Sequence, residues 1–310
     1  MKIVIGVPTY RRPIMLQRAL TSIAALDIPD EHMGTPVEVT VVVVDNDPER
    51  SAQGTIDRFS TSAPMPMRYA TSAKRGIASA RNALIEQALA ESADFCAWFD
   101  DDEMVRPGWL KELLTVQRRF SADVVAGPVS SLLPPDAPEW VRPLYTAKSR
   151  PTGSDLKTVA TSNVLFSTRL IRDWKLRFDP AFDLTGGEDV AFFAQAAQNG
   201  ARMVWAADAC LDEHVHTDRL TRRAIYLRHF GTAAAHAAAL KSRKGTLATV
   251  ARMLPKGIDR ILSAILISPL LLIRPERATA KFLAHAGTGM GSLAGIFGVR
   301  HERYQNTQGH

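Results

Sequence analysis

The chain has 310 residues, of which 46% are hydrophobic and 23% are charged. This usage is typical of globular proteins and excludes wholesale disorder and fibrous repeats. Two cysteines, Cys96 and Cys210, are too few for a disulfide scaffold or a four-cysteine zinc site, and they indicate a reducing compartment. The apolar run at residues 3–7 is shorter than the roughly 7–15 residues of a secretory signal, so we expect a cytoplasmic protein.

The net charge of +6 is unevenly distributed. Residues 217–310 hold 15 Lys/Arg against 4 Asp/Glu, a balance of +11, whereas residues 1–216 hold 23 against 28, a balance of −5. The basic part contains two uncharged stretches, 261–273 and 282–299. The first is shorter than the about 20 apolar residues of a membrane span, and the second barely reaches that length and is weakly hydrophobic. Short apolar helices with cationic flanks are typical of helices that lie on an anionic membrane. An ordinary helical subdomain with a buried face is the alternative.

Strand and helix patterns alternate through the first two thirds of the chain. We predict strands at 3–7, 37–44, 67–69, 95–99, 124–126 and 201–206, and we expect regular structure to resume around 162–166. We predict helices that begin at Pro13, at Ala78, near Trp109 and at Val190. This alternation favours an α/β fold, a mainly parallel sheet with helices on both faces. The proline-rich segment 134–158 is predicted to be a loop that moves or lines a cleft.

Polar residues follow three of the predicted strands. Thr9 and Tyr10 follow the first strand, Asp45 follows the second, and the acidic run 100–103 follows the strand at 95–99. Ligands of α/β sheets bind beyond the carboxyl ends of the strands, so we expect a site at this edge. Neither G-x-G-x-x-G after the first strand nor a P-loop motif occurs, which disfavours a dinucleotide site and a P-loop.

The run Asp100-Asp101-Asp102-Glu103 places four acids directly after an apolar strand. Closely spaced carboxylates repel one another, and the cost grows near an apolar core. Mg²⁺ or Mn²⁺ would relieve that repulsion, because both prefer oxygen ligands. A solvated acidic turn that caps the next helix is the alternative.

A second acidic pair, Glu188-Asp189, follows Gly186-Gly187 and opens an apolar helix. Acids are favoured at helix N-termini by the macrodipole. A carboxylate here could instead be a general base that takes the proton of an attacking hydroxyl. The motif alone leaves both readings open.

The segment 213–219 supplies further candidate ligands. A zinc site is disfavoured because no other Cys/His cluster supports it. Glu213 or His216 could instead support a metal held by the acidic run, with His214 as a competitor. Arg219, together with Arg222 and Arg223, could meet phosphate, which guanidinium binds in a bidentate manner; a solvated basic face is the alternative.

Five segments occur in the order and spacing of one known family. They are Val7-Pro8-Thr9-Tyr10-Arg11-Arg12, Val43-Val44-Asp45-Asn46, Gly76-Ile77-Ala78-Ser79-Ala80-Arg81-Asn82, Phe99-Asp100-Asp101-Asp102-Glu103 and Thr185-Gly186-Gly187-Glu188-Asp189. Together they resemble glycosyltransferase family 2, with the GT-A fold, from residue 3 to about residue 223. One departure is Asp47-Pro48-Glu49, where that family usually continues into a small pair such as Gly-Ser.

The resemblance implies a domain organisation and a role for each candidate site residue. Residues 1–223 would form the GT-A domain, with a nucleotide half at about 1–130 and an acceptor half at about 131–223, and residues 224–310 a helical, membrane-associating region. Asp189 would be the catalytic base, with Glu188 as the rival. Mg²⁺ or Mn²⁺ would bind Asp102 and Asp100, completed by Glu213 or His216. The nucleotide-sugar donor would be bound by Pro8, Thr9, Tyr10, Arg12, Asp45, Arg81, Asp100, Asp101 and Arg219.

The resemblance also implies a reaction: inverting transfer of a sugar, with a UDP-hexose as the leading donor, to a hydroxyl of a glycan or lipid-linked acceptor. It is nearest to bacterial transferases that build exopolysaccharide or other surface glycans, at the inner face of the cell membrane. The alternatives are a non-catalytic nucleotide-binding or membrane scaffold of the same fold and a metal-dependent nucleotidyltransferase. A nucleic-acid partner is disfavoured because the basic residues lie beside apolar stretches rather than among stacking aromatics. The sequence indicates no oligomeric state.

Overall fold

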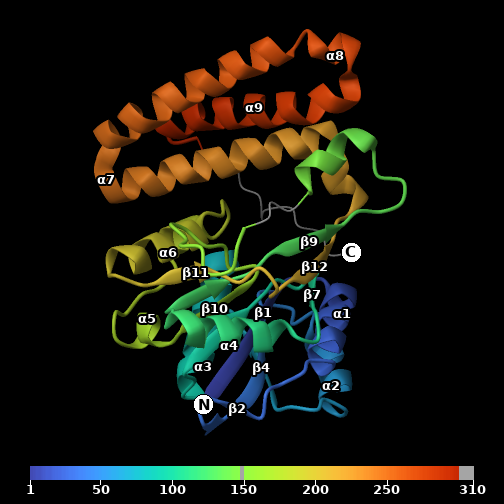
Figure 1. Ribbon diagram of the computed structural model, residues 1–310, viewed down its shortest axis with the longest axis vertical. Coiled ribbons are helices and arrows are strands. Elements are labelled where there is room, and N and C mark those ends of the chain that lie inside the picture. The colour runs from blue at the N-terminus through green and yellow to red at the C-terminus, as the bar shows by residue number, and fades with distance from the viewer. Residues whose placement is uncertain (147–149, 300–310) are drawn as a thin grey trace.

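The computed structural model describes residues 1–146 and 150–299, and Figure 1 shows an α/β body beneath a layer of long helices. The body is built on a seven-stranded sheet in the order β11-β8-β10-β6-β1-β4-β5. All neighbouring strands in this sheet are parallel except β10, which is antiparallel to β6 and to β8. The predicted α/β architecture with a mainly parallel sheet is therefore confirmed. The strands are β1 (Lys2–Thr9), β4 (Glu38–Asp45), β5 (Met67–Thr71), β6 (Phe95–Trp98), β8 (Val124–Ala126), β10 (Val164–Ser167) and β11 (Met203–Trp205).

Alternate side chains of the central strands enter two separate cores. In β1, Ile3, Ile5 and Val7 pack with the helices of one face, whereas Val4 packs with those of the other. Burial on both faces explains why β1 and β4 are nearly continuous runs of β-branched residues. The helices of the first face are α1 (Pro13–Ala24), α2 (Gln53–Ser60) and α4 (Trp109–Phe120), and those of the second are α3 (Ile77–Ala90), α5 (Arg169–Arg172) and α6 (Glu188–Gln198).

A small sheet that the sequence did not predict lies beside the carboxyl ends of the main strands. It contains β7 (Glu103–Val105), β12 (Leu211–His214) and β9 (Val129–Leu132), with β12 in the middle. Its register places Glu213 opposite both Glu103 and Ser131. These strands have three or four residues each, too few to show a period in the sequence. Their pairing brings residue 213 to the end of the acidic run.

Short elements complete the body. The strands β2 (Glu31–His32) and β3 (Thr35–Pro36) form a hairpin. Within the proline-rich segment, residues 139–144 form a 3₁₀ turn, η1 (Glu139–Leu144), and two further 3₁₀ turns are η2 (Pro180–Phe182) and η3 (Thr217–Leu220). The turn η3 leads directly into the C-terminal helices.

The C-terminal region is helical, as predicted, and folds back on itself. The helix α7 (Arg222–Ile267) is interrupted at Gly245, whose φ of 79° and ψ of 174° are not helical. We call residues 222–244 the inner segment and residues 246–267 the outer segment. The chain continues through α8 (Leu270–Ile273) into α9 (Pro275–Ile296). Figure 1 shows α9 running between the two segments of α7.

Glycines on two faces of α9 allow this close packing. A Cβ at Gly291 would lie 2.2 Å from the carbonyl oxygen of Phe230 in the inner segment. A Cβ at Gly289 would lie 2.8 Å from a side-chain carbon of Ile261 in the outer segment. The predicted uncharged stretch 282–299 thus has glycines that serve helix packing, as the subdomain alternative expects. Across residues 1–146 and 150–299, no helix combines the length and hydropathy that a membrane span requires.

Candidate active site

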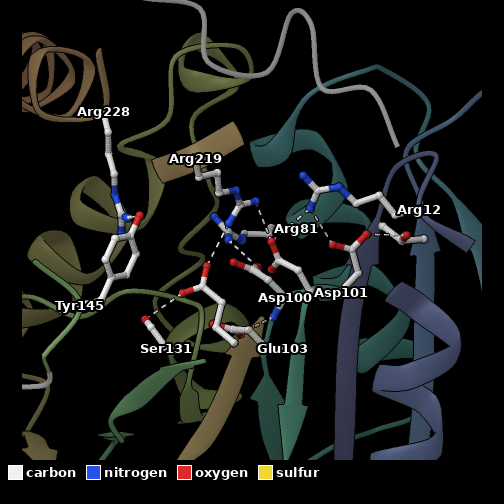
Figure 2. A network of polar contacts seen from close by, with 12 residues as sticks. Arg12, Arg81, Asp100, Asp101, Glu103, Ser131, Tyr145, Arg219 and Arg228 are labelled. Atoms are coloured by element: carbon white, nitrogen blue, oxygen red, sulfur yellow. Dashed lines mark hydrogen bonds and ion pairs between the residues drawn. The ribbon is translucent and has the colours of Figure 1, made fainter. Parts of the chain in front are cut away.

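A cleft of about 970 Å³ opens where the carboxyl ends of β1 and β6 face the start of α6 and the inner segment of α7. Most of the residues that the sequence nominated line this cleft; Asp45, His214, Arg222 and Arg223 do not. Figure 2 shows the polar network along one side of it. The nominated lining residues are Pro8, Thr9, Tyr10, Arg12, Arg81, Asp100, Asp101, Asp102, Glu188, Asp189, Glu213, His216 and Arg219.

Asp101 ties the acidic run to the end of β1. Thr9 donates a hydrogen bond from Oγ1 to Asp101 Oδ2 at 2.7 Å, and Arg12 Nη1 lies 3.1 Å from Asp101 Oδ1. Burial raises the pKa of Asp101 to about 6, against the opposing effect of Arg12. Both oxygens of the Asp101 carboxyl therefore accept hydrogen bonds from residues of the α/β body. Asp101 thus fixes the position of the acidic run.

Asp102 is held by two arginines from distant parts of the chain. Arg219 donates from Nη2 to Asp102 Oδ2 at 2.7 Å and from Nη1 to Glu213 Oε1 at 2.9 Å. Arg12 donates to the same Asp102 oxygen at 3.3 Å. Burial raises the pKa of Glu213, and the nearby Asp102 raises it further. Arg219 thus bridges the acidic run and the small sheet directly before α7 begins.

Arg81 joins the two acidic motifs. It donates from Nη1 to Glu188 Oε1 and from Nη2 to Asp100 Oδ1 at 3.2 Å. Its side chain is 5% exposed and that of Glu188 is 3% exposed. Burial raises the pKa of Glu188 to about 7, although the Arg81 charge acts in the opposite direction. Among the described residues, Glu188 Oε2 accepts no hydrogen bond.

Asp189 differs from its neighbour in both exposure and contacts. It is half-buried, it lines the cleft, and its Oδ1 accepts a hydrogen bond from the backbone N–H of Val190. Across residues 1–146 and 150–299, no ion pair holds this carboxylate. The preceding Gly187 has a φ of 98°, and a Cβ there would lie 3.1 Å from the Ala235 methyl carbon, so glycine permits α6 to start close against α7. Of the two acids, Asp189 therefore presents the more accessible carboxylate.

One side of the cleft is formed by the loops after β1, β4 and β5. Tyr10 lies against the guanidinium groups of Arg11 and Arg75, at 5.4 and 4.9 Å from its ring centre. Asn46 lines the cleft and accepts the backbone N–H of Gly76 at 3.1 Å. Asp45 is fully buried beneath it.

The Asp45 carboxylate accepts its hydrogen bonds from neighbouring residues of the α/β body. Oδ1 accepts the backbone N–H of Asp47, and Oδ2 accepts the backbone N–H of Ala52 and the hydroxyl of Tyr69. Asp47, which replaces the usual small pair, is bonded by Arg11 at 3.0 Å. The departure from the family pattern thus adds an ion pair that fixes this loop.

The three competitors at 213–216 occupy different places. Glu213 and His216 line the cleft, whereas His214 is exposed at the end of β12 and does not line it. His216 caps η3 rather than continuing the strand, so the two histidines do not share a strand face. Arg222 and Arg223 are exposed and lie outside the cleft lining.

Three carboxylates, Asp100, Asp102 and Glu213, supply the hard oxygen donors that Mg²⁺ and Mn²⁺ prefer. In the described part of the chain, however, no three acidic, histidine or cysteine side chains converge on one point as a metal site would require. Arginines neutralise these carboxylates instead. The donor chemistry fits a divalent cation, and Arg219 would have to give up Asp102 to such an ion.

Sequence reasoning missed one wall of the cleft. The inner segment of α7 contributes Ala224, Leu227, Arg228, Thr232, Ala235 and His236. Arg228 lies over the ring of Tyr145, from the segment after η1, and donates to its hydroxyl at 3.4 Å. No pattern in the sequence indicates that a helix after residue 222 returns to the cleft. Only the prediction that 134–158 moves or lines a cleft pointed toward this side. Of that segment, residues 144–146 line the cleft.

Comparison with known proteins identifies the class. The family model for glycosyl transferase family 2 matches residues 4–174, more than half of the chain. The protein belongs to this family, and it is a glycosyltransferase.

Individual relatives agree with this assignment. The chain is 28% identical over 301 residues to the succinoglycan biosynthesis protein ExoM of Rhizobium meliloti (strain 1021), covering 96% of this chain and 93% of that protein. A crystal structure of S. aureus TarS 1–349 matches with a TM-score of 0.54 and 18% identity, over 94% of this chain and 91% of that one. The same fragment in complex with UDP-GlcNAc matches with a TM-score of 0.54 and 15% identity, over the same shares of the two chains. These structural likenesses support the GT-A fold.

Proposed function

We propose that the protein transfers a sugar, with inversion, from a UDP-sugar to a hydroxyl of a lipid-linked glycan during synthesis of a bacterial surface polysaccharide. One observation carries the proposal. The acidic run and the start of α6 face the same cleft and are joined through Arg81, which contacts both Asp100 and Glu188. A donor group and an acceptor group can thus be held side by side.

The donor lies on the β1 side of the cleft. Tyr10 and Asn46 border the base, Pro8 and Thr9 shape the loop, and Asp45 positions that loop from below. The TarS fragment crystallised with UDP-GlcNAc and with UDP supports a uridine nucleotide. A hexose is the leading sugar. Arg12, Arg81 and Arg219 supply cationic groups for the diphosphate and are held in place by the carboxylates, of which Asp100 also faces the sugar.

A Mg²⁺ or Mn²⁺ ion at Asp102, with Asp100 and Glu213 or His216 beside it, would neutralise the charge of the leaving diphosphate. Arg219 would have to move for such an ion to bind, because it contacts Asp102 and Glu213 at 2.7 and 2.9 Å. Its guanidinium would then be available to a phosphate oxygen. Asp101 remains bound to Thr9 and Arg12 and keeps the turn in shape.

Asp189 acts as the general base. The acceptor oxygen attacks the anomeric carbon, the bond from that carbon to the diphosphate oxygen breaks, and the acceptor proton passes to the Asp189 carboxylate. A single displacement inverts the configuration and needs no nucleophilic side chain. Glu188 is buried against Arg81, so it positions that arginine rather than reaching the acceptor.

The acceptor enters on the α7 side, where the inner segment and Tyr145 form the wall. The relative named for succinoglycan biosynthesis supports an exopolysaccharide acceptor. A lipid-linked acceptor of this kind supports a cytoplasmic protein at the inner face of the cell membrane. The basic C-terminal region supplies the membrane contact.

The test is a panel of nucleotide sugars with Mn²⁺, scored for nucleotide release and for thermal stabilisation. We expect one UDP-sugar to stabilise the protein and to release UDP when a glycan acceptor is added. A protein that is stabilised by nucleotide without any turnover would be a binder, and the proposal would be wrong.

A further inference from the structure

The outer segment of α7 carries a continuous apolar face that nothing in the described chain covers. Of the fifteen large hydrophobic side chains exposed in the described residues, nine lie between residues 247 and 273. Leu266 is 78% exposed and Leu272 is 91% exposed. We call these nine the outer apolar face: Leu247, Leu254, Ile258, Leu262, Ile265, Leu266, Leu270, Leu272 and Ile273.

The spacing of these residues places those of α7 on one side of the helix. Steps of seven, four, four and three residues from Leu247 to Ile265 return to the same side of a 3.6-residue helix. Met253, Gly257 and Ala264, at other positions of the same segment, are buried. The apolar residues of the outer segment therefore form one solvent-facing stripe, and three more exposed apolar residues follow in α8. A patch of this kind on a protein surface marks an interaction site.

A row of cations lies on another side of the same segment. Arg252, Lys256 and Arg260 recur every four residues, so they lie together on the polar side of the helix, away from the apolar stripe. Partial burial lowers the pKa of Lys256, and the neighbouring Arg260 and Arg252 lower it further. Asp259 lies 3.7 Å from Arg260, a long distance for an ion pair, so it does little to neutralise the three cations. A helix with one apolar face and with cations on its polar face is typical of a helix that lies in the interface of an anionic bilayer.

Helix packing fixes where the cleft lies relative to this face. The inner segment turns Arg228, Thr232 and Ala235 toward the cleft, and its opposite side, with Phe230, packs on Gly291 of α9. The other side of α9 packs on the outer segment. The inner segment, α9 and the outer segment therefore lie between the cleft and the outer apolar face; Figure 1 shows α9 between the two segments of α7. At about 8–10 Å between helix axes and about 10 Å per helix, this is a distance of about 25 Å.

We propose that the outer apolar face docks on an anionic lipid bilayer, so that the cleft stands about 25 Å from the membrane surface. The proposal rests on the proposed function in one respect, namely that the acceptor is lipid-linked. The headgroup layer of a bilayer is only about 5–7 Å thick, so a lipid diphosphate lies well short of the cleft. The reacting hydroxyl consequently belongs to a glycan already extended from its carrier, rather than to the first sugar on the lipid.

The first experiment measures co-sedimentation with vesicles of phosphatidylglycerol and phosphatidylcholine at low salt. Leu262→Glu with Leu266→Glu, and separately Arg252→Glu with Lys256→Glu, should each weaken binding at least tenfold. Met33→Glu is the matched control. Met33 is 69% exposed on the β2–β3 hairpin, away from the C-terminal helices α7, α8 and α9, so this variant should bind like the wild type. Point substitutions are needed because deleting residues 257–299 would also remove α9, which packs on the inner segment that forms the cleft wall. Equal binding by all variants would overturn the proposal.

The second experiment measures orientation by tryptophan quenching with brominated lipids. Leu247→Trp and Leu272→Trp, near the two ends of the outer apolar face, should both be quenched, whereas Met33→Trp should not. Quenching of only one end would mean that the helix does not lie along the membrane surface, and the proposed separation of about 25 Å between cleft and membrane would be wrong. If Leu262→Glu instead splits a dimer in sedimentation velocity while vesicles bind no variant, the face is a contact between copies and the proposal is wrong. UDP-sugar stabilisation of the same variants reports on the proposed function separately, because none of these residues lines the cleft.

Discussion

Replacing Arg81 by methionine should destabilise the protein in a strongly pH-dependent way. Arg81 is the buried counter-charge of Glu188 and also binds Asp100. Breaking a buried ion pair by removing one partner costs about 3–5 kcal/mol. Asp100 keeps 36% of its side chain exposed and can be resolvated, so we expect the low end, about 3 kcal/mol at pH 8. At about 2–4 °C per kcal/mol, the midpoint of thermal unfolding should fall by about 6–12 °C.

The pH dependence follows from the pKa of Glu188, which burial raises from 4.5 to about 7. A carboxyl whose pKa is higher in the folded than in the unfolded protein lowers stability as the pH rises between those two values. In the wild type this loss ends near pH 7. Without Arg81 the pKa of Glu188 rises further, so the loss continues above pH 7. The gap between variant and wild type should be smallest near pH 5 and widen toward pH 8.

The assay is differential scanning fluorimetry from pH 5 to pH 8 in the presence of EDTA. Arg172→Met is the matched control, because Arg172 pairs with Asp173 on the surface, where both side chains are at least 48% exposed. Such a pair contributes about 0–1 kcal/mol, and the control should change little at any pH. An Arg81→Met variant with the same loss at pH 5 and pH 8, or with no larger loss than the control, would refute the reasoning.

Two further substitutions test the cleft. Asp102→Ala should abolish turnover that depends on Mg²⁺ or Mn²⁺; full turnover of the wild type in excess EDTA would contradict the metal assignment. Gly76→Ala should destabilise the protein by about 2 kcal/mol or more and raise the KM for the donor, because Gly76 has a φ of 150° and its added Cβ would lie 2.1 Å from Asp183. Gly108→Ala, where the added methyl meets nothing within 4 Å, is its control, and equal stability of the two variants would count against the expected strain.

The sequence predicted the sheet and most of the cleft because the apolar runs that indicate strands end at the polar residues that indicate a site. Buried strands such as β1 and β4 are apolar runs, and the polar residues that follow them necessarily meet at the carboxyl edge. Thr9, Asp101 and Asp102 were found in this way. Asp45 follows the same rule but turns inward to its own loop, which depends on the backbone N–H groups of Asp47 and Ala52 and so on tertiary geometry.

The contacts that the sequence could not give are those between distant segments. Nothing in the order of residues indicates that Arg219 meets Asp102, 117 positions earlier, or that Arg81 joins Asp100 to Glu188. The strand β12 has four residues, too few to show a strand pattern in the sequence, yet its pairing sets the position of Glu213. The wall formed by the inner segment depends on the reversal at Gly245 and on the glycines of α9, whose role appears only once α7 and α9 are packed.

The central claim, a transferase whose base is Asp189, is tested most directly by comparing Asp189→Asn with Glu188→Gln at saturating donor. A base is needed for attack but not for donor binding, so Asp189→Asn should lower turnover by about 10²–10⁴ and leave the Kd for the nucleotide nearly unchanged. Glu188→Gln should keep far more of the turnover, because its oxygen can still accept from Arg81. Wild-type turnover in Asp189→Asn, with the loss in Glu188→Gln, would move the base to Glu188. No effect of either change would contradict the account.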